Sequence, residues 1–161
     1  MKLRAVRRED HTIVSPKLNE WWGGRQMSSM IPRLFFEHFQ DTSFIMEEDD
    51  NMIGFLVGFL SQSNADEAYI HFVGVAPEYR QRKIGRQLYE AFFKKVLKEG
   101  RTVVKAITSP VNKTSIAYHT RMGFEIQAGD GVIEGTPVSL DYDGVGKHRV
   151  LFKKVLNQPD G

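Results

Sequence analysis

The segment from residue 68 to residue 100 limits the fold of this chain more than any other stretch. AYIHFVGVA, residues 68–76, is rich in branched and aromatic side chains and stops at Pro77, which is typical of a β-strand. Beyond Pro77 the apolar residues recur every four positions from Leu88 to Val96, and this spacing predicts a helix of about four turns. A strand that passes through a short cationic loop into a helix indicates an α/β protein.

Two strands are predicted directly before this segment. SFIMEE and MIGFLVGFLSQ are apolar runs on either side of the turn residues EDDN, and SNADEA supplies the next turn. Three sequential strands joined by short turns predict an antiparallel meander. Nearer the N-terminus we expect a short strand at residues 3–6, a helix that begins at residues 8–10 and a second helix at residues 31–40.

The second half of the chain predicts a crossover. TVVKAIT is a short branched strand, SIAYHTRM is helical up to Gly123, and FEI resumes a strand. Residues 129–146 are rich in glycine and weakly patterned, and residues 148–156 alternate as a last strand. We therefore predict one α/β (α+β) domain spanning residues 1–161, with a mixed, largely antiparallel sheet and helices packed on its faces.

Composition narrows the function classes. The 161 residues carry a formal net charge of only +2, which argues against a domain that binds nucleic acid through its overall charge. The chain has no cysteine, which excludes disulfides, thiolate catalysis and cysteine-ligated zinc. The charged N-terminal residues and the lack of a run of about 18 apolar residues predict a soluble, cytoplasmic protein without a membrane segment.

The loop PEYRQRKIGRQL, residues 77–88, has three interpretations. A helix N-terminus offers unpaired backbone N–H groups, Gly85 allows close approach of a ligand, and the cations Arg80, Arg82, Lys83 and Arg86 favour an anion such as pyrophosphate. The second interpretation is an ordinary solvated helix start. The third is a strip for nucleic acid, but the nearby aromatic residues Phe92 and Phe93 fall largely on the packing side of the helix.

A second segment favours the anion-binding interpretation. VGVAPEYRQRKIGRQLYEAF followed by NKTSIAYHTRMGF resembles the cofactor-binding core of the GCN5-related N-acetyltransferases. The loop of that family runs from Gln or Arg through two residues to Gly, any residue, and Gly or Ala. Arg80 and Gly85 match this pattern, whereas Lys83 replaces its first glycine. We expect an ordinary φ at Lys83, with its N–H free to donate to a phosphate and its ammonium near the 3′-phosphate or pyrophosphate of coenzyme A.

The resemblance implies a sheet of six to seven strands with helices on both faces. It also implies an acetyl-CoA-dependent N-acetyltransferase that moves an acetyl group to a primary amine by direct attack in a ternary complex. A relative that binds coenzyme A without catalysis is the alternative. The acceptor, a small molecule or a peptide, is not identified by the residues, and a homodimer through the last strands is compatible with the pattern.

The resemblance further assigns residues to roles. The strand before the loop is expected to splay from its neighbour, so that the free backbone groups of Phe72 to Val75 hold the pantetheine arm and the Val75 N–H stabilises the oxyanion. Tyr118 is the expected acid that protonates the departing thiolate. The implied cofactor-binding residues are Val73, Gly74, Val75, Arg80, Gln81, Arg82, Lys83, Ile84, Gly85, Arg86, Asn112, Ser115 and Tyr118.

Each of these assignments has a structural alternative. Tyr118 could simply pack on the sheet, and Asn112 could cap its helix instead of binding pantetheine. His71 could line the acceptor pocket and relay a proton from the amine through water, or it could be satisfied within the sheet. Strict alternation places Tyr69, His71 and Val73 on one face of their strand.

Four other features of the sequence resemble parts of a functional site. Trp21-Trp22-Gly23-Gly24-Arg25 could form a substrate wall, although core anchoring by one tryptophan is the simpler expectation. Glu47 and Glu48 are interpreted as solvated residues before a turn. The five histidines lack metal-ligand spacing, so no metal site is predicted. Asp141-Tyr142-Asp143-Gly144 lacks the later ligands of a calcium loop and is expected to be a turn or a mobile flap.

Overall fold

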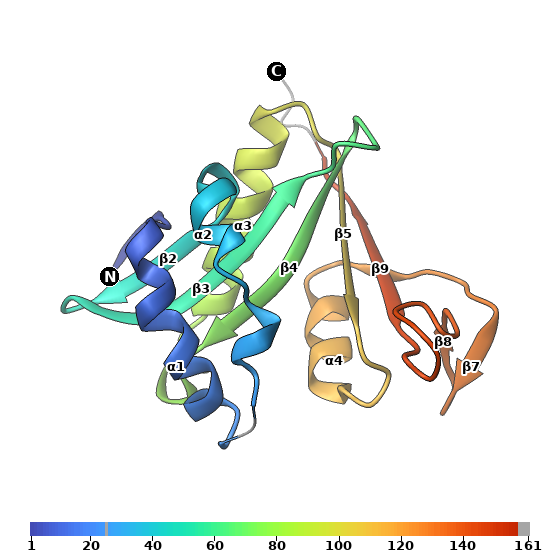
Figure 1. Cartoon of the computed structure of the whole chain (residues 1–161). Helices are drawn as coiled ribbons and strands as arrows, with labels where there is room; N and C mark the ends of the chain where they lie inside the picture. The colour runs from blue at the N-terminus through green and yellow to red at the C-terminus, as the bar shows by residue number, and fades with distance from the viewer. Residues whose placement is uncertain (25, 158–161) are drawn as a thin grey trace.

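The computed structural model describes residues 1–24 and 26–157 (Figure 1). Its main sheet has seven strands in the order β1-β2-β3-β4-β5-β9-β6, and β4–β5 is its one parallel pair. This confirms the predicted mixed, largely antiparallel sheet. The strands are β1 (Lys2–Ala5), β2 (Phe44–Glu48), β3 (Asn51–Leu60), β4 (Glu67–Val75), β5 (Val103–Thr108), β6 (Glu125–Ile126) and β9 (Val150–Val155).

Helices cover both faces of the sheet, as predicted. One apolar cluster packs α1 (His11–Trp21) and α2 (Leu34–His38) on one face, and a second packs α3 (Ile84–Lys98) and α4 (Lys113–Arg121) on the other. The period-four residues of α3, Leu88, Phe92 and Val96, are all fully buried, which is why this segment forms a helix against the sheet. No helix within residues 1–24 and 26–157 combines the length and apolarity that crossing a membrane requires.

The C-terminal half contains the predicted crossover and one unpredicted element. Strand β5, helix α4 and strand β6 follow one another in the chain, and β9 inserts between the two strands and pairs antiparallel with both. The glycine-rich stretch forms a small separate hairpin of β7 (Gly131–Ile133) and β8 (Thr136–Val138). These strands have only three residues each, too few for a visible alternation of apolar and polar side chains.

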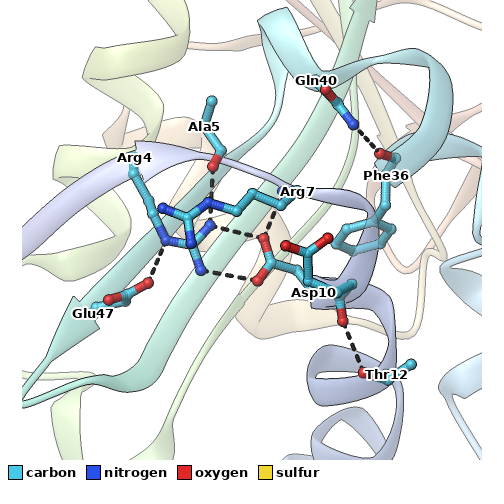
Figure 2. Close-up of polar contacts among 9 residues, drawn as sticks. Arg4, Ala5, Arg7, Asp10, Thr12, Phe36, Gln40 and Glu47 are labelled. Atoms are coloured by element: carbon cyan, nitrogen blue, oxygen red, sulfur yellow. Dashed lines mark hydrogen bonds and ion pairs between the residues drawn. The ribbon is translucent and has the colours of Figure 1, made fainter.

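A partly buried ionic cluster joins the first strand to the start of the first helix (Figure 2). The Arg4 guanidinium donates to both carboxylate oxygens of Asp10, at 2.8 and 2.9 Å, and its Nε donates to Glu47. Burial by itself would raise the pKa of Asp10, but the bonds from Arg4 and from the Arg7 N–H outweigh it and hold that pKa below its usual value. The expectation that Glu47 is merely solvated was wrong, because its partner Arg4 lies 43 residues away in sequence.

A β-bulge in β4 changes which side chains share a face. Val57 pairs with Phe72 and the next residue, Gly58, pairs with Ile70, so His71 is the extra residue. Beyond the bulge, Val73 therefore packs with the α3 side of the sheet and Phe72 with the α1 side. The predicted shared face of Tyr69, His71 and Val73 was wrong, since it assumed an uninterrupted alternation.

Candidate active site

The parallel strands β4 and β5 pair only at their beginnings. Residues 67–69 of β4 pair with residues 103–105 of β5. Figure 1 shows the two strands diverging beyond this point, toward the end at which α4 lies. The Ala76 N–H donates to the carbonyl of Ile53 on β3, at 2.8 Å. Because successive residues alternate in direction, the N–H and C=O groups of Val73 and Val75 face the opened side of β4. The expected splay is therefore present, but the expectation for Phe72 and Gly74 was wrong, because their backbone groups face β3.

The N-terminus of α3 adjoins this opening. A 3-10 turn, Pro77–Tyr79, leads into the loop, and the first backbone bond at the start of the helix runs from the Gln87 N–H to the Lys83 carbonyl. No side chain caps α3. Within the described residues, no acceptor contacts the N–H of Lys83, Ile84, Gly85 or Arg86. Such a row of free donors attracts an anion.

Lys83 contradicts the expectation of an ordinary φ. Its φ is +59° and its ψ is +24°, which is the left-handed region that glycine adopts most easily. Ile84 is fully buried and the Lys83 carbonyl already accepts the first helical bond, so the chain must turn sharply at Lys83 to bring its next residues into the helix. Lys83 thus adopts the left-handed backbone conformation that a glycine would adopt at this position.

The cations of the loop are not equivalent. Arg80 donates to the carbonyls of Val75 and Trp21, at 3.3 and 3.2 Å, and so ties the loop to β4 and α1. Arg82 makes two bonds to Glu48, at 3.1 and 3.2 Å, which corrects the interpretation of Glu48 as a solvated residue. The hydrogen bond from Tyr79, followed by that from Arg82, lowers the pKa of Glu48.

The remaining loop cations are exposed. Arg86 makes a long ion pair with Glu90, 3.9 Å, in which both side chains are more than half exposed. Lys83 is also exposed and makes no ion pair within the described part of the chain. These two cations are therefore the ones most readily available to a phosphate.

The hydroxyl of Tyr118 is buried at the same opening. Within the described residues it is the one buried side-chain polar atom without a hydrogen-bond partner. It lies so close to Gly85 that a Cβ on that residue would be 2.7 Å from the oxygen and 3.8 Å from Val75. Burial raises the pKa of Tyr118, although Arg86 and Arg121 act in the opposite direction.

Asn112 and Ser115 begin α4. The Asn112 Oδ1 accepts the Ser115 N–H at 3.1 Å. Asn112 therefore caps the N-terminus of α4, which was the structural alternative to binding pantetheine. The Ser115 hydroxyl lies 3.3 Å from the Nδ1 of His119. Both side chains therefore already have partners within their own helix.

His71 is held by residues on the side of the sheet that α1 and α2 cover. Its Nε2 lies 2.7 Å from the carbonyl of Met30, and its ring stacks on Phe35 with centroids 4.5 Å apart. Since a carbonyl only accepts, Nε2 donates to it, and Nδ1 is the acceptor nitrogen of the neutral ring. His71 is thus positioned at the bulge with one nitrogen available as an acceptor.

The two tryptophans have separate roles. Trp21 is 7% exposed and stacks on Phe55, which confirms the core-anchoring alternative for one of them. Trp22 is half-buried and packs against Phe72, with ring centroids 5.4 Å apart. Arg25, the last residue of that motif, lies outside the described residues.

Sequence reasoning missed a buried pair beside Tyr118. The Tyr89 hydroxyl lies 3.0 Å from the Nε2 of His119, which is only 8% exposed. A signal was present, because Ile116, His119 and Met122 recur at helical spacing and so lie on the packed face of α4.

The segment Asp141-Tyr142-Asp143-Gly144 forms a turn, as predicted. The Asp141 carboxylate accepts the Gly146 N–H at 2.7 Å.

The acetyltransferase (GNAT) family profile matches residues 8–124 of this chain. The chain belongs to this family. Its curated relatives include the L-2,4-diaminobutyric acid acetyltransferases of Nocardia farcinica, 31% identical over 90 residues, and of Shouchella clausii, 28% identical over 86 residues. These alignments cover 56% and 53% of this chain, and the chain spans about half the length of both relatives, 47% and 48%.

Solved structures share the GNAT fold over almost the whole chain. Ard1 from Thermoplasma volcanium has a TM-score of 0.76 at 18% identity, with 98% of each chain covered. Diaminobutyrate acetyltransferase EctA from Paenibacillus lautus, determined with its substrate L-2,4-diaminobutyric acid and coenzyme A, has a TM-score of 0.69 at 19% identity. That match covers 99% of this chain and 98% of the other. At these identities the likeness concerns the fold.

Proposed function

We propose that this GNAT protein is an acetyl-CoA-dependent N-acetyltransferase that modifies a small primary amine by direct attack in a ternary complex. The observation that carries the proposal is the Tyr118 hydroxyl, which is buried without a partner where β4 separates from β5 and α3 begins. A buried hydroxyl normally finds a partner. An unpaired one at an anion-binding helix start fits a proton donor that awaits a ligand.

The residues of the opening fit coenzyme A in three respects. Free N–H groups at the start of α3 would bind the pyrophosphate, with Lys83 and Arg86 as exposed cations beside them. The outward N–H and C=O groups of Val73 would bind the amides of the pantetheine arm, which leaves the Val75 N–H for the acyl group. Acetyl-CoA, when bound, supplies a thioester as the activated acyl donor.

The chemistry assigned to the chain is the movement of two protons and the stabilisation of one oxygen. The Val75 N–H would donate to the acyl oxygen as charge develops on it. The free Nδ1 of His71 would accept a proton from the amine, directly or through water, because Met30 holds its Nε2 protonated. Tyr118 would protonate the sulfur, and its raised pKa keeps the phenol protonated at neutral pH.

The acceptor would approach from the α1 side of the sheet. His71 and Phe72 face that side at the bulge, and Trp22 packs against Phe72 there. The relatives named diaminobutyric acid acetyltransferases support a small-molecule amine as the acceptor class. Since their matched part is about half of their length, 2,4-diaminobutyrate is one candidate among primary amines rather than the assigned substrate.

The proposal is tested by release of free coenzyme A thiol from acetyl-CoA with a panel of primary amines that includes 2,4-diaminobutyrate. Tyr118→Phe removes only the hydroxyl, and we expect kcat to fall about 10²-fold, the usual scale for loss of a general acid. The calorimetric Kd for coenzyme A should change little. Tyr142→Phe, an exposed tyrosine, is the matched control and should keep wild-type kcat.

Two results would count against the proposal. Absence of any heat or thermal shift with coenzyme A would remove the cofactor assignment. Binding of coenzyme A without thiol release for any amine would instead identify a relative that binds the cofactor without transferring an acetyl group.

A further inference from the structure

The buried pair Tyr89–His119 joins the two helices that border the opening. Tyr89 comes from α3 and is 2% exposed, and His119 comes from α4 and is 8% exposed. Their contact, Tyr89 hydroxyl to His119 Nε2 at 3.0 Å, is the one side-chain hydrogen bond between α3 and α4 in the described part of the chain. The proposed chemistry does not use either group.

The direction of this bond follows from the other side of the imidazole ring. The Nδ1 of His119 lies 2.8 Å from the carbonyl oxygen of Ser115, which can only accept, so Nδ1 carries the proton. The Nε2 is then an acceptor and the Tyr89 hydroxyl donates to it. Burial lowers the pKa of His119 and raises that of Tyr89, so both groups are neutral at pH 7.

The ring of His119 is also fixed by packing. It stacks on Phe152 of β9 with centroids 4.5 Å apart and planes 10° apart, and Phe124 contacts it edge-on at 5.2 Å. If α4 rotated about its own axis, the His119 ring would lose both its stacking on Phe152 and its bond to Tyr89 of α3. These contacts therefore fix the rotation of α4.

Tyr118 directly precedes His119 in α4, so the rotation of the helix decides where the Tyr118 hydroxyl lies. Its ring packs on Tyr89 with centroids 5.5 Å apart, and its hydroxyl rests against Gly85 at the start of α3. We propose that Tyr89 and His119 are positioning residues that hold the Tyr118 hydroxyl at the opening between β4 and α3. This inference rests on the proposed function of Tyr118.

The test uses three variants that keep the aromatic packing. Tyr89→Phe and His119→Phe each leave one buried polar group without its partner, which destabilises the fold. The double variant Tyr89→Phe/His119→Phe removes both groups, and such a paired replacement restores most of the stability. A role in stability alone would therefore disappear in the double variant, whereas a positioning role would not.

We expect the double variant to have a melting temperature near that of the wild type, a kcat lowered about tenfold and an unchanged Kd for coenzyme A. His119→Gln, whose side-chain oxygen can accept from Tyr89, should recover part of the kcat. Titration of the Tyr118 phenol, read by ultraviolet difference spectra against the corresponding Tyr118→Phe proteins, should move toward the value of a solvated tyrosine in the double variant.

The positioning role and the acetyltransferase activity can be disproved independently. Wild-type kcat in the double variant, or an unchanged Tyr118 titration, would overturn the positioning role while leaving the acetyltransferase proposal intact. If the wild-type protein acetylates no amine, the proposed function fails, and the Tyr118 titration still decides whether the Tyr89–His119 bond places that hydroxyl.

Discussion

The Tyr118 hydroxyl occupies the space that a side chain on Gly85 would need, since a Cβ there would lie 2.7 Å from the oxygen. The two residues come from different helices and are 33 positions apart, 118 − 85. Gly85 was expected to admit a ligand to the backbone. It also leaves room for the proposed acid, so one glycine serves two elements of the site.

This contact predicts the effect of Gly85→Ala. In a helix, alanine is favoured over glycine by about 0.5–1 kcal/mol, and this gain offsets part of the cost of the close contact. We expect a small change in thermal stability but a kcat at least about tenfold lower, because the Tyr118 hydroxyl must move. The control is Gly85→Ala in a Tyr118→Phe background, where the alanine should raise the melting temperature. An equal cost in both backgrounds would contradict the contact.

Lys83→Gly should stabilise the protein. The left-handed conformation of Lys83 costs about 1–2 kcal/mol, and glycine adopts it without that cost. Since glycine also loses more backbone entropy on folding, we expect a net gain of about 0.5–1 kcal/mol in the free energy of unfolding by urea denaturation. Lys94→Gly, at an exposed position inside α3, should instead lose about 1 kcal/mol.

Glu48→Gln should tighten binding of coenzyme A. Glu48 holds Arg82, the residue before Lys83, through two bonds and neutralises its charge. Its removal releases the guanidinium for a phosphate, and we expect the calorimetric Kd to fall about two- to fivefold at low salt, less at high salt. Asp50→Asn, in the same turn and without an ion pair in the described residues, is the charge-matched control. An equal effect of both variants would indicate general electrostatics.

Asp10 should make the free energy of unfolding decrease at low pH. Because its pKa is lowered in the folded protein, its contribution is fully present above the unfolded value of about 4 and is lost as pH falls through the lower folded value. Asp10→Asn should cost about 2 kcal/mol at pH 7, since it weakens charge-assisted bonds to Arg4, and clearly less at pH 3. Urea denaturation of both proteins at the two pH values provides the measurement; equal differences would contradict the assignment.

Prediction from sequence succeeded where a local pattern is repeated. The four-residue period of α3 and the apolar runs of β3 and β4 defined these elements, because each buries its own apolar side chains against the sheet. The same reasoning could not see the bulge at His71. A bulge is set by the pairing of two strands, here Val57 and Gly58 with Phe72 and Ile70, and not by the residues of one strand.

Some features of the site could be predicted from the sequence, and others depend on the tertiary structure. The strand, the cationic loop, the helix start and Gly85 were readable from the sequence, since the order of elements alone creates a helix N-terminus with free N–H groups. Tertiary structure decided which groups within it remain free. Arg82 is engaged by Glu48, His71 by Met30, and His119 by Tyr89, each from a distant part of the chain, whereas the Tyr118 hydroxyl alone stays buried and unpaired among the described side chains.

The φ of Lys83 marks the boundary between the two levels. By itself the sequence determined that a loop joins β4 to α3 and that a lysine stands where a glycine is usual. Its residue type favours an ordinary φ, and only the folded chain overrides that preference: burial of Ile84 and the first bond of α3 fix the turn, and their combined stabilisation exceeds the strain at one residue.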